Sequence, residues 1–180
     1  MSLWSRRLRP PAGLRSLLAA DERVLAMAED GPAAVAATQY GLWLPAGSDP
    51  DAAAAPWRRI GWEQVVKATW AEDGLQVIEG LLDDSGVVSD RPALTLRLAE
   101  PRTLPAVVKT RVEASIARWE QVRVPGGTAR IVARRRPGTD GLLWTARLDT
   151  GTPDSEPARA ALLGYLDRVV RQASEQLFPS

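Results

Sequence analysis

The densest group of side chains with binding chemistry is a set of arginines late in the chain. Arg134, Arg135 and Arg136 are consecutive, and Arg130 lies shortly before them. Guanidinium groups bind phosphates and carboxylates through charge-assisted hydrogen bonds. We therefore treat these four residues as a candidate patch for an anion or an acidic partner. A strand end with exposed arginines is the simplest interpretation, and binding of nucleic acid through residues 130–136 is an alternative.

Carboxylates provide a second candidate chemistry. Residues 148–152 read Leu-Asp-Thr-Gly-Thr, which matches the active-site signature of aspartic proteases, where two such aspartates share a proton. The chain has a single copy, so a protease would need a homodimer. Asp83, Asp84 and Asp90 form an acidic loop without the ligand spacing and terminal Glu of a calcium loop. A simpler interpretation of residues 148–152 is a strand end followed by a turn. A simpler interpretation of the acidic loop is that it is an ordinary solvated loop.

Two missing residue types limit the chemistry further. The sequence has no histidine and no cysteine. It therefore lacks imidazole bases, thiolate nucleophiles, disulfides and the usual zinc ligands. Nothing else supplies an activated nucleophile or a paired acid and base. We predict a protein that is not an enzyme and has no cofactor or metal, with a small enzyme using carboxylate chemistry as the alternative.

The charge distribution bears on partners. The net charge is +1, which gives no global field to attract nucleic acid or a membrane surface. However, residues 46–100 hold 5 basic and 10 acidic side chains, whereas residues 101–150 hold 10 basic and 4 acidic ones. Such asymmetry could orient a partner or drive self-association. We therefore predict a protein partner or self-association, with a small ligand as a further option and nucleic acid disfavoured.

The aromatic composition is unusual, with seven tryptophans, two tyrosines and one phenylalanine. Large rings mostly fill the core, but tryptophan is also enriched in binding hot spots. We name Trp57, Trp62 and Trp119 as candidate aromatics of a binding groove.

Short strands are the main elements that position these residues. Apolar runs separated by Gly, Pro and Asp predict strands at 24–28, 33–38, 42–45, 57–60, 65–70, 75–78 and 93–98. Residues 82–92 are polar and turn-rich, and are expected to form a loop. A helix should follow, with Thr103 as N-cap and Pro105 in its first turn. Its core-facing stripe is predicted to consist of Leu104, Val108, Val112 and Ile116.

This order of strands and a helix resembles the pleckstrin-homology-like (PH-like) superfold, including bacterial PH-like and GRAM-like domains. The resemblance covers residues 22–118, and the same pattern occurs in uncharacterised actinobacterial proteins. It is carried by Glu22-Arg23-Val24-Leu25, Val35-Ala36-Ala37-Thr38, Gly41-Leu42-Trp43-Leu44, Trp57-Arg58-Arg59-Ile60-Gly61-Trp62, Val65 and Ala68-Thr69-Trp70. It implies a mostly antiparallel β-barrel or sandwich that is capped by a helix and serves as a binding or scaffolding module.

Eukaryotic relatives of this fold grip inositol phosphates with basic residues of the first hairpin. In this chain the corresponding turn is Glu29-Asp30-Gly31-Pro32, which is acidic. An anionic headgroup would be repelled there, so we predict no phosphoinositide binding.

The last third of the chain predicts a βββα extension. Strands are expected at 121–124, 130–134 and 142–148, and Asp154 or Ser155 should cap a final helix. The apolar face of that helix is predicted to consist of Leu162, Leu166, Val169, Val170, Ala173 and Leu177. The extension should pack on the first domain, although an independent module joined near Trp119 is a second reading.

The predicted fold is therefore α+β, with an N-terminal arm and short helix at 1–21, a PH-like domain at 22–118 and the extension at 119–180. No apolar run approaches the roughly 18–20 residues that span a bilayer, and the N-terminus lacks the apolar region of a signal peptide. We expect a cytoplasmic, non-catalytic module that recognises a protein segment or small ligand through a sheet edge or the barrel mouth.

Overall fold

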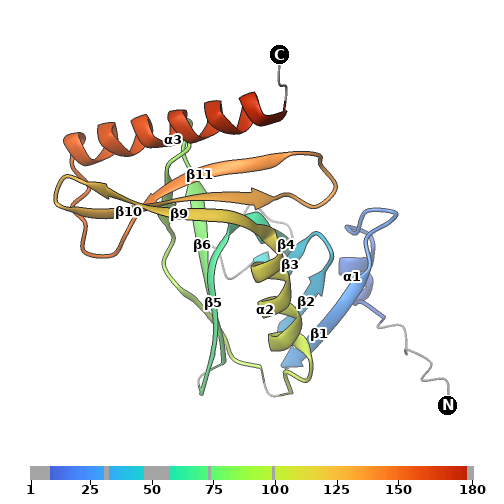
Figure 1. Cartoon of the computed structure of the whole chain (residues 1–180). Helices are drawn as coiled ribbons and strands as arrows, with labels where there is room; N and C mark the ends of the chain where they lie inside the picture. Colours follow the sequence, from blue (N-terminus) through green and yellow to red (C-terminus); the bar gives the residue numbers. More distant parts are fainter. Residues whose placement is uncertain (1–8, 31–32, 47–56, 73, 99, 178–180) are drawn as a thin grey trace. The chain divides into compact units, whose positions relative to one another are not determined.

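The computed structural model describes residues 9–30, 33–46, 57–72, 74–98 and 100–177 (Figure 1). The protein is α+β, and its described strands form three sheets in which almost all pairings are antiparallel. The chain divides into two compact units. Unit 1 comprises residues 1–79 and 92–113, and unit 2 comprises residues 80–91 and 114–180. No helix in the described part of the chain has the length and apolar character needed to cross a membrane.

Unit 1 contains a four-stranded sheet in the order β1-β2-β3-β4. Its strands are β1 (Val24–Asp30), β2 (Ala33–Thr38), β3 (Gly41–Pro45) and β4 (Trp57–Gly61). In the second sheet, β6 (Gly74–Leu82) pairs with β5 (Val65–Ala71) and β8 (Leu94–Leu96). The helices are α1 (Ala12–Arg15), the short η2 (Trp62–Gln64) and α2 (Leu104–Ser115). These strands confirm the predicted runs to within a few residues.

The turn that joins β5 to β6 requires glycine. Gly74 has φ +121°, a conformation that L side chains rarely adopt, and a Cβ there would lie 2.1 Å from the carbonyl oxygen of Leu96. The predicted break between the strands at 65–70 and 75–78 is therefore a turn, although Asp73 itself lies outside the described residues.

Both sheets of unit 1 and α2 contribute to one core. Leu42 and Trp62 come from the first sheet and the turn that follows it, Val77 from the second sheet, and Leu104 and Val108 from α2. All are essentially inaccessible to solvent. The described strands remain in two separate sheets, so the closed barrel that the sequence analysis allowed is not formed. The reason is that η2 redirects the chain between β4 and β5, which then pair in different sheets.

The α2 stripe was predicted correctly except at its end. Leu104 and Val108 are buried, and Val112 packs against the same core. Ile116 was wrongly placed on the helix, because the helix ends at Ser115 and Ile116 starts the next strand by pairing with Arg134. Sheet pairing therefore overrode the four-residue spacing.

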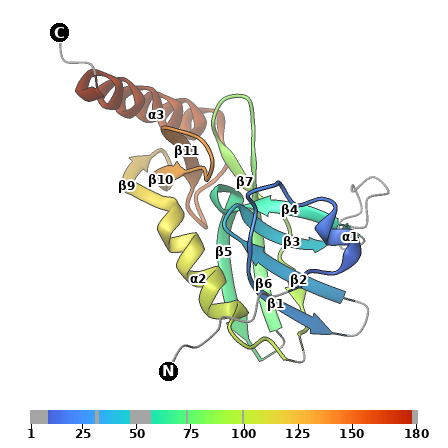
Figure 2. The same cartoon turned by 90° about the vertical axis from the view of Figure 1, so that its right-hand side faces the viewer.

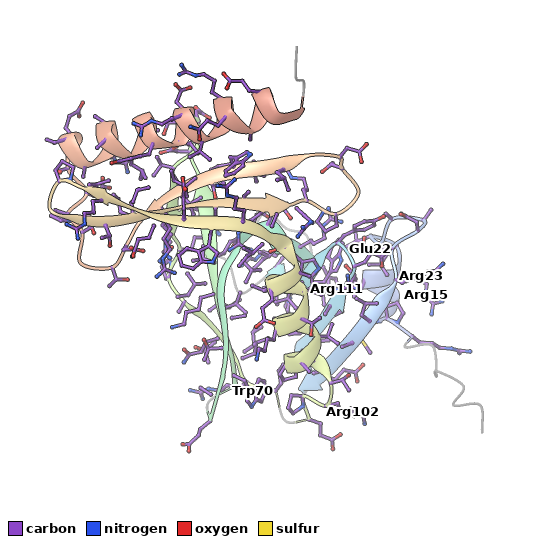
Figure 3. All side chains as sticks on the ribbon, viewed as in Figure 1. Arg15, Glu22, Arg23, Trp70, Arg102 and Arg111 are labelled. Carbon is purple, nitrogen blue, oxygen red and sulfur yellow. The ribbon has the colours of Figure 1, made fainter. Side chains whose placement is uncertain are left out.

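A buried carboxylate joins the start of unit 1 to its first sheet (Figure 3). The Glu22 side chain is fully buried. It accepts hydrogen bonds from the Thr38 hydroxyl (2.6 Å) and the Trp43 indole (2.8 Å), and from the Ala19 amide at 3.2 Å. The Arg59 guanidinium lies 3.4 Å away. All contacts to this carboxylate come from donors, which is how a buried charge is tolerated.

Unit 2 is built on an antiparallel meander covered by a helix (Figure 2). Its strands are β9 (Ile116–Val124), β10 (Gly127–Arg135) and β11 (Leu142–Leu148), in the order β11-β10-β9. The helix α3 (Glu156–Leu177) packs on one face of this sheet. The short strand β7 (Val88–Asp90) pairs with the end of β6, so the predicted loop at 82–92 is wrong in part.

The βββα order of the extension is confirmed, and Ser155 caps α3 by accepting a hydrogen bond from the Ala158 amide at 3.4 Å. Leu162 and Leu166 are buried against the meander, as predicted. Val170 is 37% exposed, so its assignment to the apolar face was wrong. Val169 packs against the same core, as predicted, and the side chain of Leu177 lies outside the described part of the chain.

Candidate functional site

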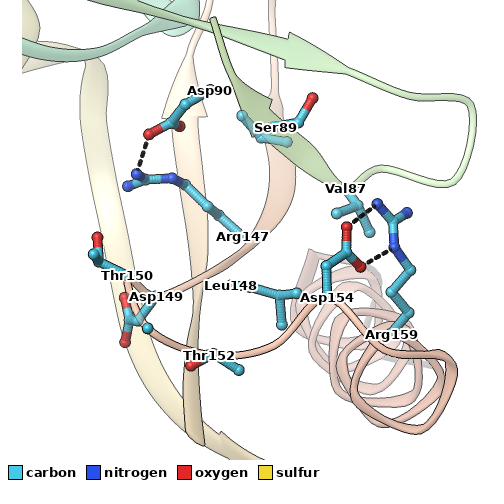
Figure 4. Close-up of a pocket in the computed structure, with 12 residues that line it drawn as sticks. Val87, Ser89, Asp90, Arg147, Leu148, Asp149, Thr150, Thr152, Asp154 and Arg159 are labelled. Atoms are coloured by element: carbon cyan, nitrogen blue, oxygen red, sulfur yellow. Dashed lines mark hydrogen bonds and ion pairs between the residues drawn. The ribbon is translucent and has the colours of Figure 1, made fainter. Parts of the chain in front are cut away.

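Unit 2 contains a pocket of about 250 Å³ between β7, the end of β11 and the loop to α3 (Figure 4). Val87 pairs with Ala146 in a parallel bridge, and the Gly86 carbonyl accepts a hydrogen bond from the Ala146 amide at 2.9 Å. Beyond this bridge the described residues of β7 and β11 no longer pair, and the pocket occupies the gap. Its charged lining consists of Asp90, Arg147, Asp149, Asp154 and Arg159.

Asp149, from the protease-like signature, is held as a carboxylate. It accepts hydrogen bonds from the Thr128 hydroxyl (2.7 Å) and the Gln121 amide (2.8 Å), and the Arg130 Nε lies 3.1 Å away. Burial raises the pKa of Asp149, but the hydrogen bonds from Gln121 and Thr128 and the charge of Arg130 outweigh it and hold the pKa below its ordinary value. A shared-proton protease dyad would instead need one carboxyl with a raised pKa.

The other pocket carboxylates are also paired. Asp154 binds Arg159 through both oxygens, and the hydrogen bond and charge of Arg159 lower the pKa of Asp154. Arg159 also reaches Asp83, at 3.4 Å. At the opposite end of the pocket, Asp90 pairs with Arg147 (Figure 4). The acidic loop and the protease-like segment thus meet in one pocket, which the sequence did not predict.

This arrangement argues against acid–base chemistry at the pocket. A general acid at neutral pH needs a raised pKa, whereas Asp149 and Asp154 have lowered ones. The two arginines are already neutralised by carboxylates, so an anionic ligand would have to displace them. Among the residues that the structure describes, no cluster of three or more potential metal ligands occurs.

The structure divides the predicted arginine patch. Arg130 lies over the Trp119 ring, with its guanidinium carbon 5.5 Å from the ring centroid. Arg134 is only 7% exposed and donates to the Ser115 hydroxyl at 2.8 Å. Arg135 donates to backbone carbonyls at the end of α2 and start of β9, and Arg136 lies in the turn towards β11. The four residues do not form one surface, because Arg134 is buried, Arg135 lies on the sheet face opposite to Arg130, and Arg136 follows the end of β10.

The three candidate aromatics occupy different environments. Trp62 is 1% exposed, and its indole donates to the Thr38 carbonyl at 3.0 Å, so it is a core residue and does not line a groove. Trp57 is half-buried and packs with Leu14. Trp119 is 58% exposed, which makes it the most exposed large apolar side chain of those described.

Trp119 belongs to β9, an edge strand. Within the described residues, β9 pairs with β10 and with no other strand. Its register places Trp119 opposite Val132, Gln121 opposite Arg130 and Arg123 opposite Thr128. Since side chains alternate along a strand, Trp119, Gln121 and Arg123 lie on the sheet face opposite to α3. We call these three residues the β9 edge.

The backbone of Thr128 shows which way the β9 edge points its hydrogen-bonding groups. The Thr128 amide donates to the Thr152 hydroxyl (3.0 Å), and its carbonyl accepts from the Asp149 amide at 2.9 Å. Both groups are therefore turned away from β9. In an antiparallel pair, opposite residues exchange both hydrogen bonds or neither. The N–H and C=O groups of Arg123 accordingly point to the open side of β9.

The same orientation holds for Gln121 and Trp119, because it repeats every second residue and the register is regular as far as Val132. The β9 edge thus presents three N–H and three C=O groups outwards, next to an exposed indole. Trp119 was among the aromatics predicted from the sequence, whereas Gln121 and Arg123 were not predicted to bind. Their alternation with Val122 and Val124 was the available signal.

Comparison with known proteins adds no relative. No protein-family model matches the sequence, and no curated protein or solved structure matches it significantly.

Proposed function

We propose that this chain is a non-catalytic binding module, built on a PH-like sandwich, that recognises an extended protein segment by strand addition at the β9 edge. The observation that carries this proposal is the outward orientation of the backbone groups of Trp119, Gln121 and Arg123. A row of unpaired N–H and C=O groups on a sheet edge is a template for another strand. Trp119 adds a large exposed ring, of the type that dominates binding hot spots.

The organisation of unit 1 supports the PH-like part of the proposal. A four-stranded antiparallel sheet, a second sheet and a following helix share one core, which is the arrangement that the resemblance implies. The non-catalytic part is supported by the pocket of unit 2, where Asp149 and Asp154 are held ionised by donors. Unit 1 then acts as a scaffold, and the recognising strand belongs to unit 2.

The proposal is tested by selecting ligands for the full chain from a random decapeptide library displayed on bacteriophage. Selected peptides are then measured against Gln121→Pro and its matched control Gln121→Ala. Both substitutions remove the side-chain hydrogen bond to Asp149, but only proline removes the outward N–H group. Proline is tolerated on a strand edge when its nitrogen faces solvent. We expect Gln121→Pro to weaken binding at least about tenfold, which is about 1.4 kcal/mol, relative to Gln121→Ala.

The peptide side of the contact offers a second readout. In strand addition, alternate residues of the ligand donate to the edge, so N-methylation should weaken binding at every second position only. Equal binding by the proline and alanine variants, together with a flat N-methylation profile, would exclude strand addition at β9. Failure to select any peptide would also contradict the proposed function.

A further inference from the structure

We infer that the segment bound at the β9 edge runs antiparallel to β9 and carries the order acidic residue, three further residues, apolar residue, acidic residue. This inference rests on the proposed strand addition and specifies the chemistry of the partner. It is carried by the charges along β9, by the register of its outward groups and by the environment of Trp119.

Most arginines of the meander already interact with another group of the chain, and the exceptions lie on β9. Residues 114–150 contain seven arginines and three acidic residues, which gives 7 − 3 = +4. Five of the arginines have an interaction within the described structure, and these are Arg130, Arg134, Arg135, Arg136 and Arg147. The remaining two, Arg118 and Arg123, are exposed and have no hydrogen bond, ion pair or ring contact with the described residues. The two arginines whose donors remain available for a partner's carboxylates therefore both lie on the edge strand.

The outward register determines which partner positions meet these arginines. An added antiparallel strand that spans β9 from Arg123 back to Arg118 places its first residue opposite Arg123 and its sixth opposite Arg118. Opposite charges that face each other across strands stabilise a pair, whereas like charges destabilise it. Acidic residues are therefore favoured at the first and sixth positions. Their separation by five positions also places them on opposite faces of the added strand, as Arg118 and Arg123 are on β9.

Trp119 defines the fifth position of the segment. The Arg130 guanidinium stacks over the indole, while the ring as a whole is 58% exposed. The partner residue directly opposite Trp119 can pack on the exposed part of the ring, and aromatic–aromatic and aromatic–β-branched cross-strand pairs are the favourable ones. An apolar residue at this position immediately precedes the second acidic residue in an antiparallel segment. In a parallel segment it would follow the first acidic residue, so the order reports the direction of the bound strand.

An acidic segment also fits the edge better than a second copy of the chain. The outward groups of two β9 strands can meet with Gln121 opposite its own counterpart and Trp119 opposite Arg123. In that register Arg118 lies opposite Val124, and neither free arginine gains a carboxylate. The contact would also bring together two meanders that each carry a charge of +4. An acidic peptide supplies carboxylates to both arginines without this repulsion.

The test repeats the decapeptide selection with the wild-type chain and with the double variant Arg118→Glu/Arg123→Glu. A matched control, Arg15→Glu/Arg102→Glu, makes the same change in net charge on exposed positions of unit 1 (Figure 3). For the wild type and the control, we expect selected peptides with acidic residues at the first and sixth positions of the bound segment. For the double variant, we expect lysine or arginine at these two positions. For one selected peptide, each acid-to-lysine change should weaken binding by roughly two- to fivefold and be rescued by reversal of the facing arginine.

The outcomes separate this inference from the proposed function. Peptides that pass the Gln121→Pro test but show no acidic preference would refute the inference and leave strand addition intact. If the selected peptides carry the apolar residue directly after the first acidic residue, the bound strand is parallel to β9 and the inferred antiparallel direction is refuted. Two other results would also overturn the inference: a stable dimer of the unliganded chain that Gln121→Pro disrupts, and displacement of the peptide by a twelve-residue oligothymidine at lower concentration than by the peptide itself.

Discussion

Replacing Glu22 with alanine should destabilise unit 1 by about 1–4 kcal/mol, through loss of acceptors for buried donors. The Glu22 side chain is fully buried, and the indole of Trp43, itself only 7% exposed, donates to it at 2.8 Å. No other acceptor of the Trp43 indole is present among the described residues. An unsatisfied buried donor of this kind costs about 1–3 kcal/mol.

The remaining contacts contribute less. The Thr38 hydroxyl donates to Glu22 at 2.6 Å, but the Gly41 carbonyl oxygen lies 3.2 Å from the hydroxyl oxygen and can accept this hydrogen bond instead. Arg59 has a side chain that is 43% exposed, so water screens its ion pair to about 0–1 kcal/mol. Together with the indole, these contacts give the expected total of about 1–4 kcal/mol.

Two further variants separate the hydrogen bonds from the charge. Glu22→Gln keeps one oxygen, which can still accept from Thr38 and Trp43, but turns an amide NH₂ towards Arg59. We expect a loss of about 1–2 kcal/mol, between that of Glu22→Ala and the smaller effect of Arg59→Ala. Trp43→Phe removes the donor, so Glu22→Ala should cost less in that background, by about 1–2 kcal/mol.

Native-state hydrogen exchange of amides in β2 and β3 measures the free energy of opening of unit 1 separately from that of unit 2. A cost of Glu22→Ala below about 0.5 kcal/mol would refute the argument, because surface substitutions commonly reach that size. Equal costs for the alanine and glutamine variants would assign the effect to the charge instead of the hydrogen bonds. A cost that is unchanged in the Trp43→Phe background would show that the indole is not the group left unsatisfied.

Three further predictions concern single positions. Asp149→Asn should destabilise the chain by about 1–2 kcal/mol at neutral pH, since charge-assisted hydrogen bonds are lost. The folded pKa of Asp149 lies below its ordinary 3.8, so this stabilisation is complete above that value and disappears as the pH falls through the folded pKa. Urea titrations of both proteins between neutral pH and the acid range should therefore converge. Gly74→Ala should destabilise the chain by about 1–3 kcal/mol. The reasons are that residue 74 has a φ of +121° and that the added Cβ would lie 2.1 Å from the Leu96 carbonyl oxygen. In contrast, Gly164 lies at an exposed position of α3, where an added Cβ would meet nothing within 4 Å. Gly164→Ala should therefore stabilise the chain by about 0.5–1 kcal/mol, which thermal unfolding measures.

Much of the fold could be predicted from local patterns. β2 and β11 have the predicted bounds, because turn residues delimit apolar runs of strand length at both places. β7 could not be predicted, because Val88-Ser89-Asp90 is short and polar and becomes a strand by pairing with the end of β6. Likewise, the spacing of Ile116 fits a helix, and only its pairing with Arg134 places it in β9.

The candidate site was predictable only in part, for a related reason. Composition identified Trp119 and the arginines as unusual, but consecutive residues of a strand face opposite sides, so the run from Arg134 to Arg136 could not form one patch. Which arginines are neutralised depends on residues far away in sequence. Arg130, for example, lies 3.1 Å from Asp149, which is contributed by the end of β11.

The direction of the β9 edge shows why recognition by the backbone is hidden from sequence patterns. Alternation of apolar and polar residues assigns Trp119, Gln121 and Arg123 to one face, but it does not tell on which side of β9 the partner strand lies. Whether their amides point to β10 or to solvent depends on that side, and the hydrogen bonds of Thr128 to Thr152 and Asp149 show that they point to solvent. If β10 paired on the other side of β9, the same side chains would be exposed, but the amides of Arg118, Glu120 and Val122 would point outwards. Proline at Glu120 would then be tolerated and proline at Gln121 would break the sheet, which is the reverse of what this structure requires.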